Sequence, residues 1–345
     1  MEPTISLCIP TYNRASLLNA ALRQISGQWA EEFEDRIEIV VSDNSSTDDT
    51  LGVLQKFAAE FPRIFLRIHL SSENKGPDAN IYQTVQMAHG VFVYILSDDD
   101  LLLPGALMKL LDLINDFPEL DAFSLNIRSF RESPVEITPC WAPLPKDTIV
   151  QDCNKALVLL NPLFLSVFAF RRSLISANDY SRAIGTNLLQ SYLFLDVMAH
   201  GNGILVTAEP YLAQRQENTS GWNFFRVMTT NLRDWLTRAE EIGFSPSASS
   251  TFLAHHLRSQ IVSAIISFKL NGGTSKLGPG ASTHPEANTY RDGMRRLWQV
   301  YGPEPFLLIV VFPLILVPGG LMRQVRNLYH LLRPRKAIPL AVHAK

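Results

Sequence analysis

The chain has 345 residues and a formal net charge of −2. A chain of this length can bury a large core, and its charge creates no global field that would attract nucleic acid, so we expect no nucleic-acid partner. The three cysteines, Cys8, Cys140 and Cys153, are odd in number and form no CxxC pair, which argues against a disulfide framework or a zinc site and fits a reducing compartment. The chain starts without a basic and apolar leader, and no stretch reaches the roughly 18 apolar residues of a membrane-spanning helix.

Strands and helices are predicted to alternate along the first 130 residues. Short runs rich in β-branched and aromatic residues mark the strands, and apolar residues at helical spacing mark the helices. The predicted strands are 5–10, 37–41, 65–70, 91–96 and 122–130, and the predicted helices are 16–25, 47–61, 78–88 and 104–117. Because strands that alternate with helices form parallel sheets with crossover connections, we expect an α/β fold.

The alternation stops after residue 130. Four prolines between 133 and 145 predict a loop. The later predicted elements are a returning strand at 163–170, a helix at 188–200, a short strand at 204–206, helices at 222–242 and 252–270, and a flexible linker at 271–286. We therefore expect a main α/β domain at 1–221, a helical region with the linker at 222–302, and an apolar and basic segment at 303–345.

The segment Ser97-Asp98-Asp99-Asp100 directly follows the apolar strand predicted at 91–96. Ligands of open α/β sheets bind at the carboxyl ends of the strands. Three adjacent carboxylates repel one another, and a hard divalent cation with oxygen ligands offsets that repulsion best. A solvated acidic turn is the simpler interpretation of an isolated Asp triplet, but the polar clusters upstream favour a site.

Each of the other early strands also ends in a polar cluster. The four clusters are Pro10-Thr11-Tyr12-Asn13-Arg14, Asp43-Asn44-Ser45-Ser46-Thr47-Asp48, Asn74-Lys75-Gly76 with Asn80, and Asp98-Asp99-Asp100. Each cluster alone is typical of a turn or a helix cap, but the carboxyl ends of parallel strands meet at one sheet edge. Such an edge can bind a nucleoside through Asp43, a metal for a diphosphate, and the remaining negative charge through Arg14 or Lys75.

The order of these clusters resembles the family 2 glycosyltransferases of the GT-A fold, over roughly residues 4–220. It looks closest to the branch that transfers deoxysugars or dideoxysugars, such as abequosyltransferases, in bacterial surface-polysaccharide assembly. The resemblance implies a Rossmann-like, mostly parallel sheet flanked by helices, with a helical C-terminal region, and places the nucleotide-sugar and catalytic domain at 1–221. It implies a nucleotide site lined by Pro10, Thr11, Tyr12, Arg14 and Asp43 and bordered by Asn74, Lys75 and Gly76.

The resemblance also implies a divalent metal, Mn²⁺ or Mg²⁺. Asp98 and Asp100 match the first and third positions of the family's DxD motif, and Asp99 would lie near the ribose or the metal. A metal there neutralises the departing nucleoside diphosphate, which makes Asp100 catalytic. The donor is then expected to be a CDP-, UDP- or dTDP-sugar and the acceptor a hydroxyl of a lipid-linked glycan.

The chain departs from the family where inverting members carry their catalytic base. Those members place a Glu-Asp pair about eleven residues before a glycine that closes a helix. Here the glycine is Gly201, and the matching positions are Leu189 and Gln190. Either another carboxylate such as Asp196 serves, or the anomeric configuration is retained. An amide is no general base near neutral pH, but it can orient a sugar, so we expect Gln190 to act by positioning and Asp196 to be structural.

A second departure follows Arg215, where the residues Gln216-Glu217-Asn218 stand in place of a histidine found in many relatives. Either Glu217 takes the place of that histidine near the metal or the diphosphate, or the ligand is absent.

The C-terminal segment combines apolar and basic residues. Residues 306–317 contain no polar side chain, and no acidic residue follows Glu304. Six basic residues follow, interleaved with apolar ones: Arg323, Arg326, Arg333, Arg335, Lys336 and Lys345. This pattern predicts docking at a membrane surface, with a core helix and a solvated basic tail as the alternative. Docking would make the protein peripheral at the cytoplasmic face of the inner membrane, where lipid-linked acceptors lie.

Other chemistries lack their motifs. The chain has no GxGxxG after a strand, no P-loop, no HExxH and no GxSxG. A sugar nucleotidyltransferase remains an alternative, although Thr11-Tyr12-Asn13-Arg14 stands where such an enzyme carries a glycine-rich phosphate loop. A non-catalytic membrane-bound scaffold that keeps the fold is the other alternative. The transferred sugar, the acceptor, the stereochemistry and the oligomeric state stay open.

Overall fold

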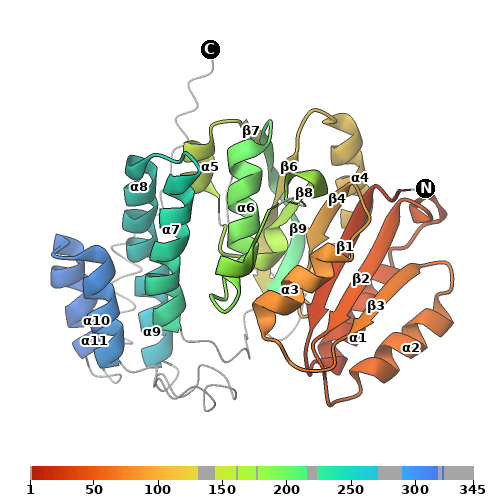
Figure 1. Cartoon of the computed structure of the whole chain (residues 1–345), viewed down its shortest axis with the longest axis horizontal. Coiled ribbons are helices and arrows are strands. Elements are labelled where there is room, and N and C mark those ends of the chain that lie inside the picture. The colour runs from red at the N-terminus through yellow and green to blue at the C-terminus, as the bar shows by residue number, and fades with distance from the viewer. Residues whose placement is uncertain are drawn as a thin grey trace. The chain divides into compact units, whose positions relative to one another are not determined.

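The computed structural model describes residues 2–130, 144–160, 162–175, 178–215, 224–270, 290–317 and 321 (Figure 1). The loop predicted at 133–145 lies almost entirely outside these residues. Residues 216–218, the linker at 271–286 and the basic tail after Leu321 lie outside them completely. The chain divides into two compact units, one within Met1–Glu217 and Asp234–Ser249, the other within Asn218–Arg233 and Ser250–Lys345.

The first unit is built on one nine-stranded sheet. Its strands are β1 (Ile5–Thr11), β2 (Ile37–Asp43), β3 (Phe65–Leu70), β4 (Phe92–Ile95), β5 (Leu101–Leu102), β6 (Ala122–Phe130), β7 (Thr148–Val150), β8 (Phe168–Arg171) and β9 (Ile204–Arg215). The order is β3-β2-β1-β4-β8-β6-β9-β5, and β7 pairs with β9. Strands β3, β2, β1 and β4 are parallel, while β8 is antiparallel to both β4 and β6. The expected α/β fold with parallel crossovers is confirmed.

Helices connect the strands of the first unit and form most of the second. They are α1 (Ala15–Ser26), α2 (Thr50–Glu60), α3 (Pro77–Gln86), α4 (Ala106–Asp116), α5 (Cys153–Leu159), α6 (Leu189–His200), α7 (Leu232–Glu241), α8 (Pro246–His256), α9 (Val262–Leu270), α10 (Tyr290–Tyr301) and α11 (Phe312–Leu316). Short helical turns lie at η1 (Glu31–Phe33), η2 (Leu165–Val167), η3 (Arg172–Leu174) and η4 (Ser181–Ala183), and π-helical stretches at η5 (Arg226–Asn231), η6 (Leu257–Ile261) and η9 (Leu307–Val311).

Two of the early helices begin later than predicted. Helix α2 begins three residues later, after Asp49, and the preceding Asp48 carboxylate accepts from the backbone N–H of Thr50 at 3.1 Å. Helix α4 begins two residues later than predicted, after Gly105, whose φ of +76° is left-handed and outside the helix. The positions of these helices are therefore confirmed and only their ends move.

The later elements differ more from the prediction. Strand β9 runs to Arg215 rather than stopping at 206, and it pairs with β6 through a register shift near Asn126. That shift accommodates Pro210, and the Asn126 side chain donates to the Ala208 carbonyl at 2.9 Å. The strand predicted at 163–170 begins only at Phe168, because residues 165–167 form η2.

The centre of the sheet is covered on both sides. Every residue of β2 and β4 is buried, and β1 is buried except for the half-buried Pro10. This explains the near-continuous apolar runs of these strands, which are typical of parallel sheets with helices on both faces. Cys8 lies in this core as a free thiol, Cys153 is also free, and Cys140 lies outside the described residues.

The second unit is helical and has its own core. Its buried apolar residues are Phe224, Phe225, Leu257, Ile261, Val262, Ile265, Ile266, Leu297, Leu307, Val311, Leu314 and Ile315. Gly293 of α10 lies against the Phe225 ring, at a distance that leaves no room for a Cβ atom. Among the described helices, none is both long enough and apolar enough to cross a bilayer.

Candidate active site

The four polar clusters meet at one edge of the first unit's sheet. Parallel pairing sets Thr11 beside Asp43, and β4 ends at the same edge just before Asp98. The buried Asn80 amide on α3 joins two of these strand ends, because its Nδ2 donates to the carbonyls of Thr11 and Ser42 at 3.1 Å each. The convergence expected from the sequence is therefore present in the fold.

Asp98 is buried and held from two sides. Its carboxylate accepts from the Thr11 hydroxyl at 2.7 Å and from the Arg14 guanidinium at 2.8 Å. The same guanidinium reaches Asp99 at 3.3 Å, and the other Asp99 oxygen accepts from the Ser97 hydroxyl at 2.6 Å. Residues from the end of β1 and the start of α1 thus fix the first two carboxylates of the acidic cluster.

Asp100 is held by different partners. One oxygen accepts from the Ser166 hydroxyl at 2.7 Å, and the other accepts from the backbone N–H of Arg215 at 3.2 Å. The Ser166 oxygen itself accepts from the backbone N–H of Ser97 at 2.9 Å, which turns its proton toward Asp100. The third carboxylate is therefore aligned by η2 and β9, two elements far along the chain.

Burial disfavours the charge on both flanking carboxylates. It raises the pKa of Asp98 to about 6 and the pKa of Asp100 to about 8, and the negative charge of Asp99 adds to both shifts. At Asp98 the positive charge of Arg14 works against this rise. Asp100 has no such ion pair within the described part of the chain, since its bonded partners are a hydroxyl and a backbone N–H.

These residues fit a divalent cation that is bound partly by the protein and partly by substrate phosphates. No group of three or more His, Cys, Asp or Glu side chains able to hold a metal occurs among the described residues. Mg²⁺, however, is commonly held by one or two carboxylates together with substrate phosphates. Asp100, a buried carboxylate with no ion pair among the described residues, lies next to the salt-bridged Asp98, and the two match that donor set.

The loops after β2 and β3 are joined by side-chain amides. The Asn44 amide donates to the Asn74 side chain at 2.8 Å and to the Gly76 carbonyl at 3.2 Å, and its oxygen accepts from the backbone N–H of Lys75 at 3.0 Å. Lys75 itself is exposed. Asn74 and Lys75 thus lie beside the end of β2, and the Lys75 ammonium is available to solvent.

Asp43 closes the turn after β2. Its two carboxylate oxygens accept from the backbone N–H of Ser46 at 3.2 Å each, and the Ser46 hydroxyl also donates to Asp43. Only 5% of Asp43 is exposed. The carboxylate is therefore prearranged by its own turn, while Tyr12 on the neighbouring loop is 41% exposed and Pro10 is half-buried.

The start of α6 is fixed by buried polar contacts. The Asp78 carboxylate on α3 accepts from the backbone N–H groups of Asn187 at 2.7 Å and Leu189 at 3.2 Å, and so replaces a local cap. Burial raises the pKa of Asp78, and those N–H groups oppose the rise.

Gln190 lies in the first turn of α6 and is 7% exposed. Its amide donates to the Leu163 carbonyl at 3.0 Å rather than to a carboxylate of the acidic cluster. Leu163 precedes Ser166 by three residues, so the segment that aligns Asp100 also carries the acceptor of the Gln190 bond. Asp196, further along α6, accepts from the Tyr180 hydroxyl at 2.6 Å and lies 4.0 Å from Arg238.

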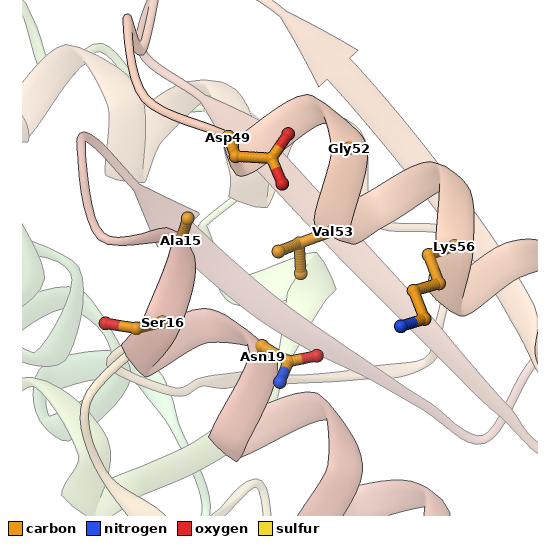
Figure 2. A pocket seen from close by; sticks show the side chains of 7 residues that line it. All are labelled: Ala15, Ser16, Asn19, Asp49, Gly52, Val53 and Lys56. Atoms are coloured by element: carbon orange, nitrogen blue, oxygen red, sulfur yellow. The ribbon is translucent and has the colours of Figure 1, made fainter.

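A separate hollow of about 310 Å³ lies between α1 and α2. Figure 2 shows its lining side chains, which come from the two facing helices: Ala15, Ser16, Asn19, Asp49, Gly52, Val53 and Lys56. Asp49 is the last residue of the loop after β2, and the Ala15 N–H donates to Asp48 of that loop. None of the lining residues belongs to the acidic cluster, so the hollow is distinct from that cluster.

The sequence analysis did not predict two groups that bind Asp100, the Ser166 hydroxyl and the backbone N–H of Arg215. Ser166 is the one polar side chain between Leu163 and Phe170, and a lone hydroxyl in an apolar run is a signal that it has a buried partner. The Arg215 contribution is a backbone N–H, which no residue type marks. Glu217, considered as a replacement for the family's histidine, lies outside the described residues.

Comparison with known sequences identifies the N-terminal half. Residues 6–174 match the model of glycosyl transferase family 2. The chain is 39% identical over 114 residues to the GalNAc(5)-diNAcBac-PP-undecaprenol beta-1,3-glucosyltransferase of Campylobacter jejuni, and 41% identical over 105 residues to the abequosyltransferase RfbV of Salmonella typhimurium. These alignments cover 33% and 30% of this chain, and 35% and 30% of the two relatives.

Solved structures share the fold over nearly the whole chain. Residues 1–349 of S. aureus TarS superpose with a TM-score of 0.61 at 17% identity, covering 95% of this chain and 91% of that one. TarS has also been solved with UDP-GlcNAc. The mannosyltransferase PcManGT of Pyrobaculum calidifontis, solved with GDP-Man and Mn²⁺, gives a TM-score of 0.54 at 17% identity, covering 96% of this chain and 88% of that one.

The shared architecture is the GT-A fold, and the family match covers the four strand ends that form the candidate site. Residues 6–174 therefore match glycosyl transferase family 2 in sequence, and the chain shares the fold of GT-A glycosyltransferases.

Proposed function

We propose that the chain transfers a sugar, such as a hexose or deoxyhexose, from a nucleoside diphosphate donor to a hydroxyl of a lipid-linked glycan. The observation that carries this proposal is the acidic cluster, with Asp98 and Asp100 buried at the edge where four strand ends meet. The names of the two sequence relatives support the acceptor class and a bacterial surface polysaccharide as the product.

Asp98 and Asp100 would hold a divalent cation, Mn²⁺ or Mg²⁺, together with the donor diphosphate. When bound, such an ion stabilises the negative charge that grows on the departing nucleoside diphosphate. The Ser166 hydroxyl and the Arg215 N–H orient Asp100 from behind. Arg14, already paired with Asp98 and Asp99, supplies fixed positive charge beside the same carboxylates.

The nucleoside would lie along the loops after β1, β2 and β3. Asp43 would accept hydrogen bonds from a base or ribose, with Thr11 and Tyr12 beside it, and the exposed Lys75 would offer a cation for phosphate oxygens. Pro10 and Asn74 shape the two bordering loops. UDP-, CDP- and dTDP-sugars all present a pyrimidine to such a site, and TarS was solved with UDP-GlcNAc.

The acceptor would approach the start of α6. We propose that Gln190 acts by orienting the sugar rather than by taking a proton, since an amide is no base at neutral pH. Its bond to Leu163 then restrains the amide, so that the carbonyl oxygen is the group that can accept from a hydroxyl. Because its acceptor is lipid-linked, the protein would work as a peripheral protein at the cytoplasmic face of the inner membrane.

Asp100→Asn should abolish metal-dependent transfer and leave the fold intact. Burial already disfavours the charged carboxylate, so a neutral amide should not lower the melting temperature. Product formation measured against Mn²⁺ concentration, with circular dichroism for the fold, provides the test. Asp116→Asn at the exposed end of α4 is the control. Full transfer by Asp100→Asn, or by the wild type in excess EDTA, would contradict the metal role.

Asp43→Ala should weaken binding of a nucleoside diphosphate by roughly 1.5–3 kcal/mol, the range for a hydrogen bond to a charged group. Calorimetric titration measures this directly. Ser46→Ala is the matched control, because it disturbs the same turn and keeps the carboxylate. Equal losses in both variants would mean that Asp43 only closes its turn.

Ser166→Ala should raise the Mn²⁺ concentration needed for half-maximal transfer by about tenfold, since Asp100 loses the donor that aligns it. Metal-free nucleotide binding should stay unchanged, and Ser166→Cys should restore part of the metal affinity. Tyr94→Phe is the control, because the Tyr94 hydroxyl donates to the Ser166 carbonyl and not to its side chain. An unchanged metal requirement in Ser166→Ala would remove Ser166 from the site.

Gln190→Ala should lower kcat by roughly ten- to a thousandfold through lost orientation of the acceptor. Asp196→Asn should lower kcat much less, because Asp196 is bonded to Tyr180. Steady-state kinetics with varied acceptor, together with the anomeric configuration of the product by NMR, provide the measurement. An inverted product with an inactive Asp196→Asn variant would assign the base to Asp196 instead.

A further inference from the structure

The last described helix of the second unit is apolar on both of its faces. It runs over residues 305–316 through η9 and α11, with Leu307, Val311, Leu314 and Ile315 packed in the unit's core. Its exposed residues form what we call the outer face: Pro305, Leu308, Ile309, Pro313 and Leu316. These positions recur at helical spacing, so they share one side of the helix.

The outer face is poorly suited to water. Ile309 is 74% exposed and Leu316 is 70% exposed, and no polar side chain interrupts residues 306–317. Scattered exposed apolar residues are ordinary, but a whole helix face without a polar group marks a contact surface. Helices that are apolar all round are found in cores or in membranes.

The length of this helix selects the kind of membrane contact. Twelve helical residues extend about 18 Å, whereas a hydrocarbon core is about 30 Å thick. This helix, as described, is therefore too short to span a hydrocarbon core, which leaves contact at the membrane surface.

The charges around the outer face favour an anionic surface. Glu304, just before the helix, is the last acidic residue of the sequence, and its carboxylate is paired with Arg258 at 2.8 Å. On α10, Arg291, Arg295 and Trp298 are exposed at helical spacing, a combination typical of membrane interfaces. Arg295 is also paired with Asp292 at 2.8 Å, so Arg291 carries most of the unpaired charge of this group in the described structure. The sequence beyond residue 320 then adds six basic residues and no acidic one.

We propose that the outer face inserts into the headgroup region of an anionic bilayer and so holds the protein on the membrane as a monotopic protein. The inference deepens the proposed function, on whose lipid-linked acceptor it rests, by naming the side chains that contact lipid. Apolar burial supplies the insertion, and the flanking arginines supply the preference for anionic lipid.

Flotation of the full chain with vesicles tests this surface. The double variant Ile309→Gln with Leu316→Gln removes two apolar side chains from the outer face and keeps helix propensity. We expect its partitioning into phosphatidylcholine–phosphatidylglycerol vesicles to fall about tenfold or more. Leu51→Gln on α2, 43% exposed, is the matched control and should float like the wild type. Wild-type binding should also be weaker to pure phosphatidylcholine.

Three outcomes would overturn the inference. One is equal flotation of the double variant and the wild type. Another is equal binding of the wild type to neutral and anionic vesicles. The third is a dimer by light scattering that the double variant dissociates while flotation stays the same, because a second copy would then cover the outer face.

Metal-dependent hydrolysis of a nucleotide sugar, measured without vesicles, separates this inference from the proposed function. The double variant changes no residue of the candidate site, so its hydrolysis should equal that of the wild type. If the wild type neither hydrolyses nor transfers and the flotation results hold, the proposed function fails and the membrane surface stands.

Discussion

Burial of the acidic cluster at the end of β4 is the constraint around which the first unit is arranged. A carboxylate taken out of water is costly unless hydrogen bonds or opposite charge replace its hydration. Asp98 receives them from β1 and the start of α1, and Asp100 receives them from η2 and β9. Each donor comes from a different element, so the chain has to bring these elements together to stabilise two side chains. At Asp100 these hydrogen bonds do not offset the cost of burial completely, and the pKa of its carboxyl stays raised to about 8.

The parts of this site that follow directly from local sequence were predictable. Each polar cluster stands at the end of an apolar strand, and parallel pairing places such ends at one edge, so the residue pattern alone groups Thr11, Asp43 and Asp98. The partners of Asp100 were not predictable, because Ser166 lies 66 residues away and Arg215 contributes only its backbone. Strand β9 was predicted too short because its pairing with β6 depends on a bulge and on Pro210, which hide the alternation of a regular strand. Local pattern thus predicted which strand ends come together, whereas the contacts that support Asp100 depend on long-range packing.

The two units differ in the kind of side chains that they bury and expose. The first unit contains the residues that match the family and the polar clusters at the strand ends, and it buries carboxylates such as Asp98 and Asp100. The second is stabilised by apolar packing of helices around Leu257, Ile261 and Leu297, and its last helix exposes apolar side chains as well as burying them. The sequence shows that residues 306–317 lack any polar group, which is compatible both with core packing and with docking at a membrane. Only the structure shows which of these residues are buried and which are exposed.

Asp78 has a consequence that reaches beyond its role at the start of α6. It lies four residues after Asn74, in the first turn of α3, and its carboxylate holds the backbone at Asn187 and Leu189. The Asp78 side chain therefore ties the loop after β3 to the helix turn that carries Gln190. Under the proposed function, the loop would lie beside the donor and Gln190 beside the acceptor. A shift of the loop on donor binding would then be passed to Gln190 through this carboxylate.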